Sequence, residues 1–228
     1  RGRTHKDNED RYFVDTAQGL YLISDGMAES ISPQIVVDTL PDLLRQRLAG
    51  VAELTDPTAL EGVGEAIAEV SQAVYKESTR RRGMLGATVV LALVHNGRAL
   101  VAHLGDSRAY LRRAGRLERL TRDHSQVQRM IDLGWIKPEE ASWRGNGGPT
   151  RYAGMKAAAE ADLRCLELQS GDRLLLCSDG LTEMLTDEEI LPLLDPALTP
   201  EQNCKRLVDA ANQAGGKDNV TVIVIAVT

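Results

Sequence analysis

Five aspartates stand at the ends of expected β-strands in this sequence, a placement that could support chemistry. They are Asp10, Asp25, Asp106, Asp179 and Asp218. The tripeptide Ser-Asp-Gly occurs twice, at 24–26 and 178–180, each time directly after an apolar run. For any single one of them, turn formation explains an Asp beside a Gly. A buried strand seldom ends on an uncompensated carboxylate, however, so the repetition favours a site where these side chains converge.

The chemistry that such carboxylates support is metal-assisted hydrolysis. Converging anions repel each other unless cations lie among them. Hard oxygen ligands without His or Cys partners suit Mg²⁺ or Mn²⁺, and the carbonyl of Gly26 can join the coordination shell beside Asp25. Two ions roughly 3.5 to 4 Å apart lower the pKa of a bridging water and stabilise in-line displacement at phosphorus. The pattern therefore predicts hydrolysis of a phosphate ester.

The elements that must position the first of these residues are a hairpin and two helices. Apolar runs at 12–15 and 20–25 predict the hairpin. A helix is expected to begin at Ser32 and Pro33, with a kink or a division at Pro41. Apolar residues recur at steps of three and four between 60 and 74, which predicts an amphipathic helix from 56–57 to about residue 80.

The rest of the chain is typical of short antiparallel strands with a second group of helices. Strands are expected at 86–96, 98–106, 107–115, 163–168, 173–177 and 219–227, and helices around 130–131, 187–194 and 200–214. Residues 125–158 are rich in Gly, Pro and polar residues and predict a surface flap. These elements indicate one α+β domain over 1–228, a four-layer αββα sandwich of two mainly antiparallel sheets packed face to face and flanked by helices.

Composition excludes several classes of protein. The chain has 228 residues, 43% of them hydrophobic, and a net charge of −6, which argues against nucleic acid as the main partner. It contains no apolar run long enough for a membrane span, and its polar N-terminal residues do not resemble a secretory signal. Three cysteines without CxxC spacing favour neither disulfides nor a zinc site. We therefore expect a cytoplasmic protein.

Six motifs carry a resemblance to a known family. They are NED at 8–10, SDGM at 24–27, GATVV at 86–90, GDSRAYLRRAGRLERLTRDHS at 105–125, GDRLLLCSDGLTEML at 171–185 and GGKDNVTVIVI at 215–225. In this order and spacing the chain resembles the type 2C metal-dependent protein phosphatases, the PPM family, over nearly its whole length. It looks most like the bacterial serine/threonine branch.

The resemblance implies a function and a set of ligands. Water held between two Mn²⁺ or Mg²⁺ ions would attack phosphoserine or phosphothreonine directly, with phosphorylated substrates of a serine/threonine kinase as partners. The catalytic set carried over is Asp10, Asp25, Asp179 and Asp218, which are also metal ligands, with Asp25 bridging the ions. The further ligands carried over are Glu9, through water, and the carbonyl of Gly26. Asp106 matches the ligand of a third, weaker ion shared with Asp179.

Several positions depart from the family pattern. Met27 stands where some members have a histidine that follows Asp-Gly, and Ala28 and Glu29 replace two glycines. Trp143 stands near the place of the usual flap histidine, and the family's opening strand is missing or shortened. His5 stands where the family usually places an arginine that clamps the substrate phosphate, so we expect weaker phosphate binding that strengthens as pH falls.

Two other functions remain to be weighed. A catalytically weakened phosphatase-like domain that binds phosphoproteins or partners would account for Ala28, Glu29 and the absent arginine. An unrelated two-metal nuclease is disfavoured by the acidic charge balance. Because every expected carboxylate is present, the sequence favours an active phosphatase.

Overall fold

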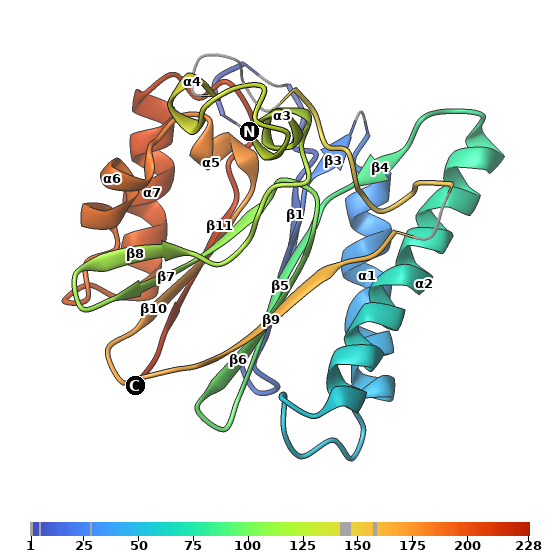
Figure 1. The fold of residues 1–228 in the computed structure, drawn as a ribbon, viewed down its shortest axis with the longest axis horizontal. Helices are drawn as coiled ribbons and strands as arrows, with labels where there is room; N and C mark the ends of the chain where they lie inside the picture. Colours follow the sequence, from blue (N-terminus) through green and yellow to red (C-terminus); the bar gives the residue numbers. More distant parts are fainter. Residues whose placement is uncertain (1, 5, 28, 142–146, 157–158) are drawn as a thin grey trace.

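The computed structural model describes residues 2–4, 6–27, 29–141, 147–156 and 159–228, which form two β-sheets packed face to face (Figure 1). The five-stranded sheet has the order β1-β2-β5-β6-β9. Its strands are β1 (Arg11–Asp15), β2 (Leu20–Ser24), β5 (Val89–His95), β6 (Arg98–Leu104) and β9 (Asp162–Glu167). All neighbouring strands in it pair antiparallel, as the sequence predicts.

The second sheet has four strands in the order β11-β10-β7-β8, also antiparallel. They are β7 (Arg108–Arg113), β8 (Arg116–Arg119), β10 (Arg173–Cys177) and β11 (Val222–Ala226). A short pair, β3 (Gly26–Met27) and β4 (Gly86–Ala87), lies beyond the end of the first sheet. The αββα sandwich is thus confirmed.

Helices cover the outer face of each sheet (Figure 1). The first sheet is covered by α1 (Ile31–Arg47) and α2 (Pro57–Arg81). The second is covered by α5 (Asp179–Thr182), α6 (Asp187–Ile190), the 3₁₀ turn η1 (Leu191–Leu193) and α7 (Pro200–Gln213). Two short helices, α3 (Gln126–Asp132) and α4 (Pro138–Ala141), lie at the end of the sandwich where the N-terminus is found.

The helix ends follow capping chemistry that the sequence carries. Asp56 caps α2 by accepting the N–H of Thr58 at 2.8 Å, and Pro57 occupies the first helical position. Thr199 and Gln202 form a reciprocal capping box at the start of α7. Both helices therefore begin where the sequence predicts.

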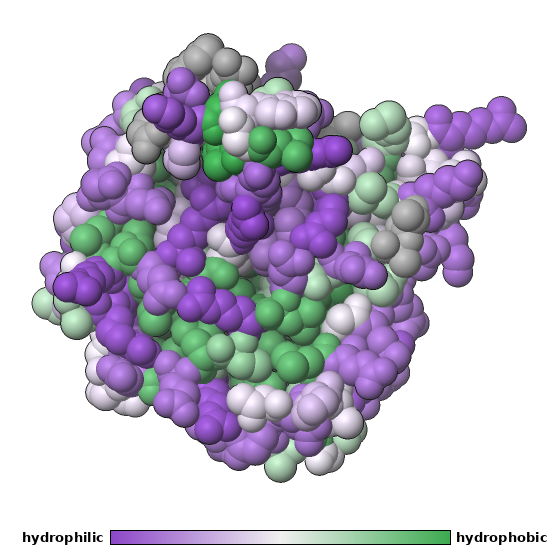
Figure 2. Space-filling view, viewed as in Figure 1, coloured by the Kyte–Doolittle hydropathy of each residue, from purple (hydrophilic) through white to green (hydrophobic). Residues whose placement is uncertain are grey.

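Side chains alternate between two sides of each strand, so each sheet contributes to two apolar layers. Leu22 faces α1 and α2, whereas its neighbour Ile23 faces the second sheet. There Ile23 and Val90 belong to the same apolar cluster as Leu174 of β10. Burying each such side chain contributes about 1.5 to 3 kcal/mol. On the face drawn in Figure 2, apolar residues gather between the two sheets and hydrophilic residues surround them. Among the described residues, no helix has both the length and the apolarity needed to cross a membrane.

Some predicted details are wrong. Pro41 does not divide α1, which runs unbroken over Ile31–Arg47. The helix continues past the proline because Leu40, Pro41 and Leu44 are all buried against the core. The segments 98–106 and 107–115 do not pair, since β6 and β7 belong to different sheets. Gly105 turns the chain between them with φ 117°, and a Cβ there would lie 2.7 Å from Thr88 Cγ2. The sequence analysis also missed β8, α4 and α5.

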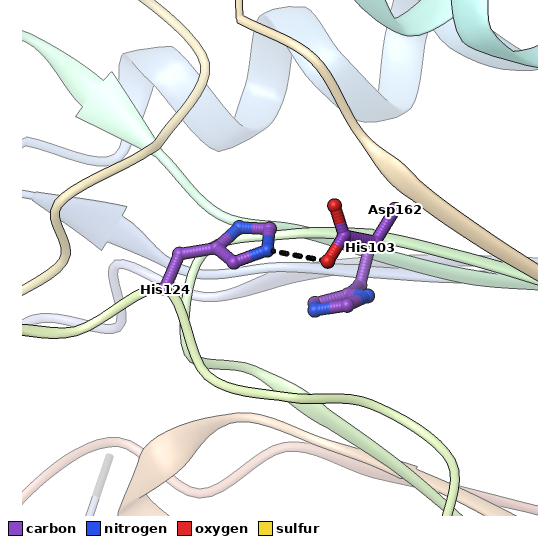
Figure 3. A group of neighbouring side chains, drawn as sticks. All are labelled: His103, His124 and Asp162. Atoms are coloured by element: carbon purple, nitrogen blue, oxygen red, sulfur yellow. Dashed lines mark hydrogen bonds and ion pairs between the residues drawn. The ribbon is translucent and has the colours of Figure 1, made fainter. Parts of the chain in front are cut away.

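A polar cluster of His103, His124 and Asp162 fastens the strand ends to the segment 147–156 (Figure 3). The two imidazole rings stack with centroids 4.5 Å apart. Asp162 accepts hydrogen bonds from His124 Nε2 at 3.2 Å and from Arg151 Nη2 at 2.7 Å. The backbone N–H of Thr150 donates to the His124 carbonyl at 2.6 Å. The cluster therefore connects three separate parts of the chain.

This cluster is structural, although its ligand-type atoms lie within 4.8 Å of one another. His124 Nδ1 accepts the N–H of Gly105 at 3.1 Å, and its Nε2 is in contact with both Asp162 and Arg151, so protein groups already occupy both ring nitrogens. His103 Nε2 lies 2.8 Å from the Arg122 carbonyl and donates to it. Burial, reinforced by the neighbouring His103, lowers the pKa of His124 to about 4.

His124 should make the folded state sensitive to acid. Its pKa is about 4 in the folded chain and 6.5 when unperturbed, so only the unfolded state binds the proton between these values. The part of the folding stability that depends on neutral His124 is therefore fully present above pH 6.5 and is lost as pH falls towards 4. In His124→Asn, whose amide oxygen can replace Nδ1 as an acceptor, urea unfolding in chelator should show a smaller loss of stability over this window. The same substitution at exposed His95 is the control, and equal slopes in wild type and His124→Asn would contradict the assignment.

Candidate metal centre

Asp25 lies directly after β2, where Thr88 holds its backbone. The N–H of Thr88 donates to the Asp25 carbonyl at 2.8 Å, and the N–H of Asp25 donates to Thr88 Oγ1 at 3.0 Å. Thr88 Oγ1 also lies 2.7 Å from the hydroxyl of Ser107, which follows Asp106 in the chain. This buried hydroxyl pair links the two aspartates through the protein interior.

Gly26 follows in a space that admits no side chain. A Cβ at this position would lie 2.9 Å from the Glu29 carbonyl oxygen and 3.0 Å from the Glu9 carbonyl oxygen. The backbone of Gly26 therefore lies against the first motif, at a position where only glycine fits.

Asp10 is buried at the start of β1 and bonds to the opposite end of the chain. Its Oδ2 accepts the hydroxyl of Ser178 at 2.8 Å. Next to it, the N–H of Glu9 donates to Asn219 Oδ1 at 2.6 Å, and Asn219 Nδ2 donates to the Asp7 carbonyl at 3.1 Å. Side chains from 178 and 219 therefore clasp the first motif, although they lie far from it in sequence.

Four of the five predicted aspartates line one pocket of about 160 Å³: Asp25, Asp106, Asp179 and Asp218. Gly26 and an additional acid, Glu183, line the same pocket. Asp10 lies beside this pocket, where its carboxyl and that of Asp25 influence each other's pKa. Glu9 lines an adjoining pocket of about 470 Å³ with Glu29 and Arg81. Larger hollows elsewhere hold no comparable cluster among the described residues.

The carboxyls in this pocket are electrostatically unfavourable by themselves. Burial raises the pKa of Asp25 and of Asp179 well above the usual range, and the other aspartates raise both further. Burial, followed by the charge of Asp123, raises the pKa of Asp106 to about 6. The pKa of Asp10 is also raised by burial. A cation among these groups would remove the repulsion.

The donor set fits a hard divalent cation. Asp10 Oδ1 and Asp179 Oδ1 are buried carboxylate oxygens without a hydrogen-bond partner among the described atoms. Unpartnered buried oxygens are rare in proteins and call for a ligand, here one that accepts electron pairs. The charged side chains in its described lining are all carboxylates, and neither imidazole nor thiolate is among them. Mg²⁺ and Mn²⁺ are the ions that such donors suit.

Glu183 is the acidic residue that sequence reasoning missed. It directly follows α5, four positions after Asp179, and a helical turn brings such residues to one face. Burial raises its pKa, and the charge of Asp218 adds to the effect. The spacing D-x-x-x-E was a usable signal, but the sequence analysis predicted no helix at 179–182.

Three positions named in the sequence analysis lie outside the described residues: His5, Ala28 and Trp143. Glu29, the second departure from the glycine pair, is described, and its carboxylate forms an ion pair with Arg81 at 3.3 Å. Gly26 still pairs with Ala87 despite this substitution. Among the described residues, Gly26 is therefore held by β4 and Glu29 by Arg81.

Comparison with known proteins supports the same interpretation. The family model described as protein phosphatase 2C matches residues 39–220. The chain is 31% identical over 235 residues to the serine/threonine phosphatase stp of Listeria monocytogenes, covering 99% of this chain and 92% of that protein. It is 35% identical over 234 residues to the serine/threonine protein phosphatase PstP of Mycobacterium tuberculosis, covering 98% of this chain and 43% of that protein.

A solved structure shows the same architecture with metal bound. The catalytic domain of the serine/threonine protein phosphatase PstP in complex with two manganese ions superposes with a TM-score of 0.83 at 32% identity, covering 98% of this chain and 93% of that one. The αββα fold, the order of motifs and these matches lead to one conclusion: the chain belongs to the protein phosphatase 2C family, among the bacterial serine/threonine phosphatases.

Proposed function

We propose that this chain hydrolyses phosphoserine and phosphothreonine in proteins by means of two Mn²⁺ or Mg²⁺ ions in the pocket of about 160 Å³. The observation that carries the proposal is the convergence of buried carboxylates, two of which, Asp10 and Asp179, each have an oxygen without a hydrogen-bond partner among the described atoms. The coarser conclusion, a protein serine/threonine phosphatase with phosphoprotein substrates, follows from the family.

The proposed ligands are the residues that the sequence analysis named. Asp25 would bridge the two ions, and the set is completed by Glu9, Asp10, Gly26, Asp179 and Asp218. A bound pair of ions supplies a water activated for direct attack on phosphorus, so no covalent enzyme intermediate is required. A third, weaker ion would lie between Asp106 and Asp179, with Glu183 beside them.

The chain's own contribution is to hold these oxygens in place. Thr88 fixes the backbone of Asp25, and Ser178 donates to one oxygen of Asp10, which leaves the other oxygen available. Asn219 positions Glu9, because its Oδ1 accepts the backbone N–H of Glu9. Because these supporting groups are themselves buried, the ligands need little rearrangement when an ion binds.

The alternative, a weakened phosphatase-like binding module, rested on Ala28, Glu29 and the absent arginine. The Glu29 carboxylate is engaged by Arg81 at the end of α2, so it does not add a competing charge among the proposed ligands. Every carboxylate of the proposed centre is present. These observations favour an active enzyme.

Hydrolysis of a small aryl phosphate should require Mn²⁺ or Mg²⁺ and stop in excess chelator. Asp25→Asn and Asp179→Asn should each lower kcat/KM by about 100-fold or more, since loss of a charged ligand in a buried site costs several kcal/mol. Full turnover in chelator, or wild-type rates from either variant, would overturn the assignment.

Thermal unfolding provides an independent test of the variants Asp25→Asn and Asp179→Asn. At neutral pH and without metal, both Asn variants should be at least as stable as wild type, because the raised pKa of each native carboxyl reflects unfavourable burial and repulsion. Mn²⁺ should stabilise wild type by about 3 kcal/mol at a hundred times its Kd and stabilise the variants much less. Collapse of the metal-free variants would show that these carboxylates serve the fold instead.

Asp106 should affect turnover more than occupancy of the central pair. Asp106→Ala is expected to retain two tightly bound ions in a metal titration while kcat falls. If its kinetics matched wild type across that titration, Asp106 would be only a turn former in the GDSR motif.

His5 remains a prediction about phosphate binding. If it occupies the clamp position, His5→Arg should lower KM for a small aryl phosphate with little change in kcat. The permanently charged, planar guanidinium would bind the phosphate in the ground state and in the transition state alike. His5→Ala should raise KM. Unchanged KM in both variants over a range of pH would remove His5 from the site.

A further inference from the structure

A second pocket, of about 450 Å³, lies between the C-terminal end of α2 and the segment 147–156. Its apolar lining includes Tyr75, Met84 and Tyr152, and the Met84 side chain is 81% exposed. In Figure 1 the segment passes from the end of the sandwich towards the upper end of α2, and hydrophilic side chains project there in Figure 2. Nothing in the phosphate chemistry proposed above uses this pocket.

The charge of this pocket is opposite to that of the chain as a whole. Arg82 and Lys156 line it, and none of its described lining residues is acidic, although the chain carries a net charge of −6. Neither cation has an ion-pair partner among the described residues. The nearby Glu77 is bound by Arg80 and Arg81, which lower its pKa to about 2, so its charge is already balanced. Two unneutralised cations therefore face solvent together.

The backbone of Arg82 adds a second observation. It caps α2 in the left-handed region with φ 55°, the position where glycine is usual at a helix end. A glycine stands immediately after it, at Gly83, so the chain carries the arginine at the strained position itself. Strain retained by a charged, exposed residue is a reason to look for a function of its side chain.

The pocket adjoins the metal centre. Gly147, Gly148 and Pro149 line the metal pocket, and Tyr152, Met155 and Lys156 of the same segment line the second pocket. The Ala87–Ala153 bridge anchors the segment between them. An extended chain advances about 3.3 Å per residue, so the three steps from Pro149 to Tyr152 span at most about 10 Å.

The wall between the two pockets is thin. Met27 lines the metal pocket and pairs with Gly86. A Cβ on Gly86 would lie 2.6 Å from Tyr152 Cδ2 on one side and 2.9 Å from Met27 Sδ on the other. A peptide with its phosphorylated residue at the metals can therefore place a side chain in the second pocket a few residues away.

We propose that this pocket binds an acidic side chain of the substrate protein, three to five residues from the phosphorylated residue. The proposal rests on the proposed function, because it assumes that a phosphorylated residue occupies the metal pocket. Arg82 and Lys156 supply the charge, and the aromatic and methionine lining accommodates the aliphatic part of a Glu or Asp side chain. The pocket thereby selects among phosphoproteins.

The test uses phosphothreonine peptides with Glu at positions three to five on either the N-terminal or the C-terminal side, each matched by a Gln peptide. For one side, kcat/KM of the Glu peptide should exceed that of its Gln partner by roughly five- to tenfold, the range of one or two partly exposed ion pairs. The preference should shrink as salt is raised. Absence of a preference on both sides would overturn the proposal.

Variants of the two cations locate the effect. The double substitution Arg82→Gln with Lys156→Gln should abolish the preference, whereas Arg80→Gln, at an exposed cation outside the pocket that already binds Glu77, should keep it. A preference that survives in the double variant would overturn the proposal. Arg82→Gly separates binding from structure: it should raise the melting temperature by relieving the left-handed backbone and still weaken the preference.

Hydrolysis of a small aryl phosphate separates failure of this proposal from failure of the proposed function. Its kcat/KM should be unchanged in all three variants, since it reaches only the metal pocket. If wild type does not hydrolyse it, the proposed function fails. Fluorescence anisotropy of the same labelled peptides then still tests the pocket, where tighter binding of Glu than Gln peptides should be seen in wild type and lost in the double variant.

Discussion

Mutual repulsion among buried carboxylates is the constraint on which this structure depends. Asp10, Asp25 and Asp179 are gathered at the edge of the sandwich, where burial raises the pKa of each. A fold assembled only for stability would not bring them together. The apolar layers between the sheets and beneath the helices supply the stability that makes this arrangement tolerable, and a divalent cation converts the repulsion into binding.

The supporting groups explain how the fold fixes the shape of the centre. Thr88, Ser107, Ser178 and Asn219 are small polar residues, all buried, and each has a hydrogen-bond partner at or next to the centre. All four lie next to strands of the two sheets, in the segments that lead into or out of those strands. The geometry of the centre is thus a property of the packed sandwich and not of one flexible loop, whereas selection among substrates can be left to the segment 147–156 at its rim.

Much of this arrangement could be predicted from the sequence, because motif order and strand periodicity are local signals. The positions of Asp25, Asp179 and Asp218 relative to their strands are examples. The passage of the chain at Gly105 from one sheet to the other could not be predicted from the sequence. A Gly-Asp turn has the same sequence whether the strands on its two sides pair or separate. Pro41 continues its helix because burial outweighed local preference. Glu183 was missed because a four-residue helix has too little periodicity to be recognised.

The clasp between the two ends of the chain has a consequence for how the enzyme matures. Ser178 bonds to Asp10 across 168 positions, and Asn219 bonds to Glu9 across 210. Contacts of such separation form late, because a long loop must close first. During synthesis the ribosome releases Asp10 early and Asp218 near the end of this sequence. The proposed metal centre is therefore incomplete in a nascent chain until the segment that carries Asp218 and Asn219 has been synthesised and β11 has joined its sheet.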